Sequence, residues 1–377
     1  MDRARACAAV LAAAALGAGC EKVIGADFTV NQTVECTHPG PFGPPSIRNA
    51  GGDGEFTVVV QSINAGDALD GGQEFNLIGY DLDGLCTNES QGPSCRSFAW
   101  ANADPTDGLG GIDNKVGSLM YSSFAIFGAQ PFSSEQQNDN YAAGTLAPVA
   151  AFRVRGWDMN SDDDQVDVDW YEPAAVEPPD GGGVADAGQT GSGLPLLASA
   201  LGPGGDLEPD GGPAYPRSIY RDTNAYVSNY TVTAHLPQAV IFIVNTPLTV
   251  QDVLVSLHIA VGVGGGPTLD TGLIGARLSL RELFSRTPLV TRRFGLTNFC
   301  TDNPTYPRVK SFFCKYADIL ASGAVNPSAN CDSISVALKV ALAPIQLGPA
   351  VDQSFDTPCA PAVDPGNDTC SVPVTSQ

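Results

Sequence analysis

The segment from Val253 to Val263 constrains the fold of this chain most strongly, because its side chains alternate strictly between two faces. One face is aliphatic at every position from 253 to 263, and the other is mixed and includes Ser256 and His258. A helical period of 3.6 residues would scatter the aliphatic side chains around the axis. The segment therefore predicts a β-strand that buries one face.

Seven further segments have strand patterns, and only two have helix patterns. The additional predicted strands cover residues 56–60, 75–78, 149–157, 166–171, 226–233, 239–244 and 334–342. A capping box of Ser279 and Glu282 predicts a helix that ends before Pro288, and apolar spacing predicts another over 307–321. Many strands, long loops and two short inserted helices predict a mainly β fold, a two-sheet β-sandwich of jelly-roll type.

The N-terminus has the features of an export signal. Arg3 and Arg5 precede an apolar run over residues 6–19 that is too short to span a membrane as a helix. The small residues before Cys20 resemble the lipobox of bacterial lipoproteins, in which the cysteine becomes the lipidated first residue. Leucine lies one position further from Cys20 than in a lipobox, so cleavage by an ordinary signal peptidase is the alternative.

We therefore expect a signal peptide at residues 1–19 and a flexible segment at 20–54 that is lipidated at Cys20. The lipid would anchor the protein in the cell envelope, in the outer membrane. The formal net charge of −22 repels phosphate backbones and argues against nucleic acid as a partner.

Cysteine usage agrees with an oxidising compartment. Eight of the ten cysteines follow Cys20, an even number that predicts up to four disulfides. Cys86 and Cys95 are close enough in sequence to form a local disulfide, which we predict. Cys359 and Cys370 are expected to pin an irregular tail at residues 351–377.

Composition changes abruptly between residues 172 and 216, where Gly, Pro, Asp and Ala predominate. Such a segment buries too little apolar surface to offset its ordering entropy, so we predict disorder apart from a leucine-rich patch at 194–201. The segment either links two domains or interrupts one. Because the part before it supplies only four convincing strands, we favour an insertion within one β-sandwich domain at residues 55–350.

The stretch from Tyr80 to Gly117 is a long irregular loop rich in aspartate. Such loops are uncommon in compact domains unless cross-links or a bound ion hold them. The predicted ligands of a calcium ion are Asp81, Asp83, Asp113 and Asn114, with Asp104 and Asp107 able to complete the shell. Asp and Asn also form turns by bonding nearby backbone amides, which would explain these residues without an ion.

The acidic segment between the predicted strands 149–157 and 166–171 is a second candidate calcium site. Its predicted ligands are Asp158, Asn160, Asp162 and Asp164. Their alternation is similar to an EF-hand loop, but the glycine at position six and the glutamate at position twelve are missing and no helices flank the segment. A solvated, acidic hairpin tip is the alternative interpretation.

Motifs for catalysis are absent from the sequence. It contains no nucleophile elbow, zinc-protease motif or phosphate-binding loop, and nothing singles out a carboxylate pair for glycoside hydrolysis. His258 lies on the less apolar strand face and is more often a hydrogen-bonded residue than a base. Trp100, Trp157, Trp170 and Tyr171 could stack on sugar rings if exposed, although packing in the core explains them better.

Four motifs follow the export signal in order: residues 79–86, 111–114, 155–164 and 314–319. Their order is similar to that in a family of secreted lipoproteins of myxobacterial type, which has no known activity. The resemblance implies a surface location and a shared fold, and it transfers no catalytic role. We therefore expect a non-enzymatic cell-envelope lipoprotein, stabilised by calcium, that binds carbohydrate or another surface component. The alternative is a jelly-roll glycoside hydrolase or lyase that uses a carboxylate pair.

Overall fold

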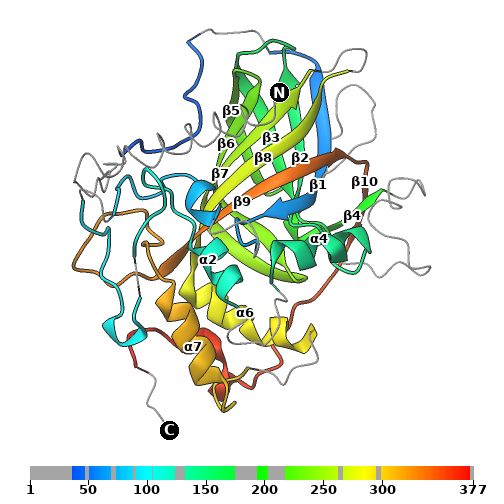
Figure 1. Ribbon diagram of the computed structural model, residues 1–377. Coiled ribbons are helices and arrows are strands. Elements are labelled where there is room, and N and C mark those ends of the chain that lie inside the picture. Colours follow the sequence, from blue (N-terminus) through cyan, green and yellow to red (C-terminus); the bar gives the residue numbers. More distant parts are fainter. Residues whose placement is uncertain are drawn as a thin grey trace, which may run out of the picture. The chain divides into compact units, whose positions relative to one another are not determined.

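The structure is a computed structural model (Figure 1). It describes residues 36–46, 51–68, 74–87, 91–103, 105–123, 132–174, 193–202, 217–261, 266–293 and 299–373, with the backbone alone at 290–293. The predicted signal peptide, the predicted lipidation site Cys20, Asp104 and most of the 172–216 segment lie outside these residues.

Eight antiparallel strands form one sheet that closes on itself. In sheet order they are β1 (Gly54–Asn64), β2 (Ala151–Trp157), β3 (Asp163–Tyr171), β5 (Tyr220–Ser228), β6 (Thr231–Ile243), β7 (Thr246–Ala260), β8 (Thr268–Ser279) and β9 (Ser333–Pro344). β1 pairs with β2 along one edge and with β9 along the other, which closes the barrel. The mainly β prediction is confirmed.

The finer prediction of a two-sheet jelly roll is not confirmed, because strands that follow one another in the chain pair with one another. Two-residue turns at 229–230 and 244–245, with positive φ at all four residues, join β5 to β6 and β6 to β7. Such turns match the twist of antiparallel neighbours and fix their pairing, whereas a jelly roll needs long crossings between two sheets. The result is a meander of neighbouring strands.

The alternation in β7 places aliphatic side chains in the barrel interior. Val253, Val255, Leu257 and Ile259 are buried, whereas His258 between them is exposed. At the end of the segment, Val261 is exposed. The barrel interior therefore forms the main hydrophobic core, to which β2 and β3 add Phe152 and Trp170.

The segment at 172–216 connects β3 to β5, and these two strands pair directly with each other in the sheet. Its leucine-rich patch contains β4 (Leu194–Leu197), which pairs in parallel with β10 (Leu347–Val351). This two-stranded sheet buries Leu194, Leu196 and Leu347 against outward-facing residues of the barrel.

Two predicted helices are present with different bounds: α6 (Leu280–Arg293) continues through Pro288, and α7 (Tyr306–Lys315) ends early. Packing of α6 against β7 and β8 outweighs the local cost of proline. No helix in the described part of the chain is long and apolar enough to cross a membrane.

Two further helices were not predicted, α2 (Lys115–Ser122) and α4 (Ser134–Ala142). The polar helix α4 lacks an apolar stripe, and it is tied to β1 because the Asn138 side chain bonds both backbone groups of Ile63 at 2.8 Å. The predicted strand at 75–78 is wrong, because residues Glu74–Leu77 form a 3-10 helix.

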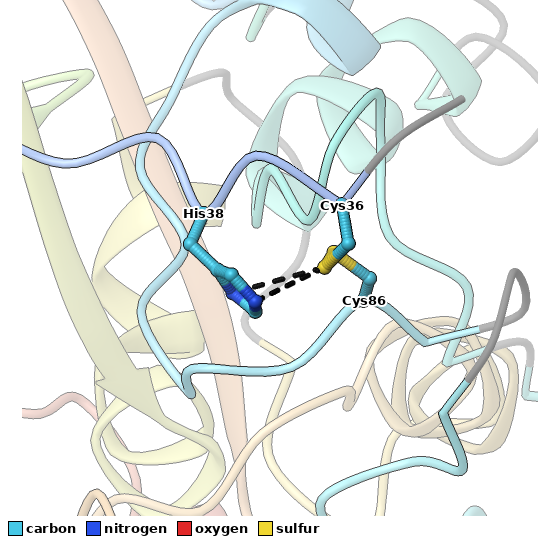
Figure 2. Close-up of side chains that lie close together, drawn as sticks. All are labelled: Cys36, His38 and Cys86. Carbon is cyan, nitrogen blue, oxygen red and sulfur yellow. Dashed lines mark hydrogen bonds between the residues drawn. A yellow bond between two sulfur atoms is a disulfide. The ribbon is translucent and has the colours of Figure 1, made fainter.

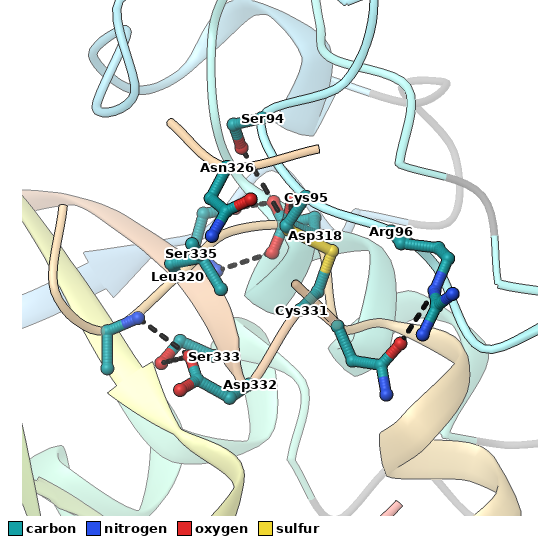
Figure 3. The surroundings of a disulfide bond; sticks show 12 residues. Ser94, Cys95, Arg96, Asp318, Leu320, Asn326, Cys331, Asp332, Ser333 and Ser335 are labelled. Atoms are coloured by element: carbon teal, nitrogen blue, oxygen red, sulfur yellow. Dashed lines mark hydrogen bonds between the residues drawn. A yellow bond between two sulfur atoms is a disulfide. The ribbon is translucent and has the colours of Figure 1, made fainter. Parts of the chain in front are cut away.

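The eight cysteines after Cys20 form four disulfides, as the even count predicts. The pairs are Cys36–Cys86 (Figure 2), Cys95–Cys331 (Figure 3), Cys300–Cys359 and Cys314–Cys370. The predicted local disulfide between Cys86 and Cys95 is therefore wrong, because each pairs with a segment that is distant in sequence. Cys359 and Cys370 attach the C-terminal tail to residues around α7.

Candidate metal centre

The long loop that follows residue 79 returns to its own start. The Asp113 amide donates a hydrogen bond to the Tyr80 carbonyl at 2.9 Å, and the two residues form an isolated β-bridge. Gly79 has φ 147°, and a side chain there would lie 3.0 Å from the Asp113 carbonyl oxygen. This close approach brings residues about thirty positions apart to one place.

Three carboxylates meet where the loop closes. Asp81, Asp83 and Asp113 each offer an oxygen, and these oxygens lie within 4.8 Å of one another. The turn between the first two is fixed by the Asp81 carboxylate, which accepts from the Gly84 amide at 2.6 Å. Gly84 has φ 75°, a conformation that glycine adopts without strain. The structure thus contains an acidic cluster that could hold a metal ion.

Asp113 is the innermost member of this cluster and is only 1% exposed. Its Oδ2 accepts hydrogen bonds from the amides of Leu82 at 2.6 Å and Asp83 at 3.3 Å. Its Oδ1 has no hydrogen-bond partner among the described residues. Burial raises the pKa of Asp113 well above its usual range, and the nearby Asp83 carboxylate raises it further. A buried oxygen without a partner is costly unless a proton or a cation satisfies it.

Two more carboxylates, Asp107 and Asp318, lie behind Asp113 around a polar cavity of about 10 Å³. This volume suits one water molecule or one ion. Burial raises the pKa of Asp107 to about 8 and that of Asp318 to about 6. The Lys115 ammonium also lines the cavity and donates to the Thr106 carbonyl at 2.5 Å. The Lys115 ammonium therefore places a positive charge near the inner carboxylates, Asp107 and Asp318.

Asp318 is held by Ser335 of β9 (Figure 3). The Ser335 hydroxyl donates to one Asp318 oxygen at 2.5 Å, and the Ser335 amide donates to the other at 2.9 Å. The hydroxyl of Ser335 also accepts from the Lys115 amide at the start of α2. These bonds fix the inner carboxylate to the barrel wall. Sequence reasoning missed Asp318, because nothing in its local pattern connects it to a loop some 200 residues earlier.

Arg277 of β8 connects the acidic loop to the barrel wall through hydrogen bonds. Its side chain is 2% exposed and donates to the carbonyls of Leu82 and Leu320 and to the Asp252 carboxylate at 2.9 Å. Tyr80 adds a second fastening, since its hydroxyl donates to the Ser256 hydroxyl of β7 at 2.6 Å. The carboxylates therefore sit on a loop that is anchored to rigid strands.

The fourth predicted ligand, Asn114, has a different role. It is the N-cap of α2, where its side-chain oxygen accepts from the Gly117 amide at 3.0 Å. Its side-chain amide donates to the carbonyls of Ala65 and Ile78. Both polar ends of the Asn114 side chain thus form hydrogen bonds with the backbone. Of the four predicted ligands, three are clustered carboxylates and the fourth caps a helix.

The predicted hairpin site has a geometry set by its own hydrogen bonds. The Asp158 carboxylate accepts from the backbone and side-chain amides of Asn160, and the Asp162 carboxylate accepts from the Ser161 hydroxyl and the Asn229 amide. Among the described residues, the carboxylates of Asp158, Asp162 and Asp164 do not form a group of three ligand atoms like that around Asp113. These bonds agree with the alternative of an acidic hairpin tip, and calcium binding at the hairpin stays a prediction.

The predicted aromatic and histidine candidates do not form a site. Trp157, Trp170 and Tyr171 are buried, and the Trp100 indole donates to the Cys370 carbonyl at 2.9 Å. His258 is exposed and lies 2.9 Å from an Asp270 oxygen.

Comparison with family models, with curated proteins and with solved structures gave no match.

Proposed function

We propose that this chain is a non-enzymatic lipoprotein of the cell envelope whose folded domain binds one calcium ion at Asp81, Asp83 and Asp113. The observation that carries the proposal is the buried Asp113 Oδ1, which has no partner among the described residues and belongs to a cluster of three carboxylates. A cation at this position would satisfy that oxygen and reverse the repulsion between the carboxylates.

The donor set favours calcium over softer metals. All three candidate ligands are carboxylate oxygens, which are the ligands of calcium and magnesium. They come from an irregular loop, and calcium tolerates irregular geometry and partial hydration better than magnesium does. Three carboxylates completed by water resemble the weaker extracellular calcium modules, for which Kd is about 0.1–1 mM.

The cavity beside Asp113 fits an ion better than a sugar ring, which supports ion binding at this cluster over glycoside hydrolysis there. The cavity of about 10 Å³ beside the carboxylates is far smaller than the clefts of several hundred Å³ that hold small molecules. The envelope location rests on the export signal, the cysteine at position 20 and the similarity to secreted lipoproteins of myxobacterial type. Within that location, the partner we propose is carbohydrate or another surface component.

Calcium is expected to raise the melting temperature of the protein by several degrees relative to chelator. At 10 mM calcium and a Kd of about 0.1 mM, binding to the folded state alone stabilises it by about 2.7 kcal/mol. For a chain of this length, that corresponds to about 4 °C. Thermal unfolding followed by circular dichroism in chelator, magnesium and calcium measures the shift.

Asp113→Asn should abolish the calcium shift without unfolding the protein, because asparagine resembles the protonated carboxyl group. Asp158→Asn in the hairpin is the matched control and should keep the full shift. Identical melting curves of the unaltered protein in calcium, magnesium and chelator would contradict calcium binding.

Lipidation is expected at Cys20 in protein purified from its native envelope. Mass spectrometry of the N-terminal peptide should show a diacylglyceryl group on this cysteine, and Cys20→Ser should release the protein from membranes. A mature N-terminus without lipid at another residue would show that an ordinary signal peptidase processes the chain.

A further inference from the structure

A second cluster of metal-binding residue types lies beside the acidic loop. It consists of the disulfide Cys36–Cys86 and the imidazole of His38 (Figure 2). Cys36 Sγ lies 3.2 Å from His38 Nε2, and the candidate ligand atoms of all three residues lie within 4.8 Å of one another. In the disulfide form the sulfurs are bonded to each other and are poor metal ligands.

The distances approach those of a tetrahedral zinc site. With Zn–S near 2.3 Å and Zn–N near 2.0–2.1 Å, tetrahedral angles place two sulfurs about 3.8 Å apart and a sulfur and a nitrogen about 3.6 Å apart. The histidine nitrogen is already close to this separation from Cys36. The Cα atoms of Cys36 and Cys86 are 5.9 Å apart, so side-chain rotation can separate reduced sulfurs without a large backbone movement.

The second ring nitrogen of His38 has the partner that zinc-binding histidines usually have. His38 Nδ1 lies 2.5 Å from Asp81 Oδ2. A carboxylate at this nitrogen fixes the tautomer, directs Nε2 towards the metal and makes the ring a better ligand. The Asp81 side chain is 2% exposed, so this contact is shielded from water.

Backbone hydrogen bonds hold His38 and Asp81 in place without help from the disulfide. The His38 amide donates to the Gly110 carbonyl at 3.0 Å, and the Asp81 amide donates to the Pro39 carbonyl at 2.8 Å. These bonds attach the segment at 36–39 to the central loop on both sides of the histidine. Reduction of the disulfide would therefore leave His38 and Asp81 near their present positions. The amides of Leu85 and Thr87 donate to the carboxylates of Asp81 and Asp107, which holds the chain on both sides of Cys86.

We infer that reduction of Cys36–Cys86 creates a zinc site from two cysteine thiolates and Nε2 of His38. The required reductant is a thiol: its thiolate attacks the more exposed Cys36 sulfur, the S–S bond breaks and Cys86 leaves as thiolate. A second thiol attacks the reductant sulfur of the mixed disulfide and releases Cys36, which yields two protein thiols and one disulfide between the two reductant molecules. Zinc then displaces two protons, and because the His38 side chain is 45% exposed, water can occupy the fourth position.

The inference goes beyond calcium binding, because its ligand atoms differ and zinc prefers sulfur and nitrogen. Reoxidation would release the metal, so the site would hold zinc only while a reductant is present. The other three disulfides are buried, with all six of their cysteines at most 8% exposed. A small thiol should therefore reach Cys36 first.

The test measures protection of each cysteine from alkylation in the mature protein. The protein is reduced with a small thiol, which is removed, and then alkylated with or without zinc sulfate before peptide mapping. We expect zinc to slow alkylation of Cys36 and Cys86 at least tenfold, with uptake of one zinc ion per chain by the reduced form only. His38→Gln removes a ligand and should weaken zinc binding by more than the roughly 10–100-fold that loss of an outer-shell partner costs, whereas His258→Gln, at a similarly exposed histidine, should leave it unchanged.

Because peptide mapping reports each cysteine separately, reduction of other disulfides does not obscure the result. Zinc uptake that persists in Cys36→Ser/Cys86→Ser, or the absence of protection at both cysteines, would overturn the inference. Asp81 belongs to both proposals, as a calcium ligand and as the partner of His38. Calcium-dependent melting is measured on the oxidised protein, which lacks the zinc site, so failure of either proposal leaves the other standing.

Discussion

Replacement of Cys95 and Cys331 by alanine is expected to lower the free energy of unfolding more than removal of any other disulfide in this chain. The bond closes a loop with a sequence separation of 236, the largest of the four. Loop-closure entropy for this length corresponds to about 5 kcal/mol, compared with about 4 kcal/mol for the separation of 59 between Cys300 and Cys359. Urea unfolding of the two double-alanine variants measures the difference.

The surroundings of the Cys95–Cys331 bond add to its expected effect. Both cysteines are fully buried, and the adjacent backbones are paired: the Arg96 amide donates to the Ala329 carbonyl at 2.7 Å, and the Cys331 amide donates to the Arg96 carbonyl at 3.0 Å. Alanine at both sites leaves a cavity in this packed region, which destabilises further. Equal or smaller destabilisation than in the Cys300→Ala/Cys359→Ala variant would contradict this account.

The sequence predicts local strand geometry well and long-range closure poorly. Alternation from Val253 to Ile259 identifies β7, because one buried face leaves a period of two in the sequence. Closure depends on the pairing of β1 with β9, some 280 residues later, and no local pattern records which strand edges will meet. The two-residue turns at 229–230 and 244–245 are the local features that indicate a meander, because each joins two neighbouring strands.

The three carboxylates of the acidic cluster could be predicted because aspartate is a common calcium ligand. Aspartate and asparagine also form turns, so the same residue types fit both roles. The sequence could not separate the two roles, and the structure assigns them differently: Asp113 keeps a buried oxygen without a partner among the described residues, whereas Asn114 caps α2. The disulfide error has a related cause. Nearness of Cys86 and Cys95 in sequence favours pairing only if no distant segment packs against either one.

In the presence of chelator, the protein is expected to lose stability as the pH rises from about 5 to about 8.5. Burial raises the pKa of Asp318 to about 6 and that of Asp107 to about 8, from the ordinary aspartate value of 3.8. Between these values the folded state binds more protons than the unfolded state, so the free energy of unfolding falls with increasing pH. The contribution of these groups is complete below the unfolded pKa and is lost as the pH passes 6 and then 8.

Asp107→Asn should flatten this pH dependence, because asparagine cannot lose a proton. The full shift of the Asp107 pKa would correspond to about 5–6 kcal/mol, and partial exposure of the side chain to solvent reduces the expected effect to on the order of 3 kcal/mol. Urea unfolding at several pH values in chelator gives the slope for both proteins. The control Asp162→Asn, in the exposed hairpin, should keep the slope of the unaltered protein, because the pKa of Asp162 is lowered by its hydrogen bonds to Ser161 and Asn229.

Saturating calcium should reverse or remove the same slope, because a cation at Asp81, Asp83 and Asp113 favours deprotonated carboxylates throughout the cluster. The difference between the calcium and chelator profiles should therefore widen as the pH rises from 6 to 8.5. Parallel pH profiles of the unaltered protein and Asp107→Asn in chelator would show that the inner carboxylates are not protonated in the folded state. In that case the Lys115 ammonium, rather than bound protons, would balance the charge around the inner cavity.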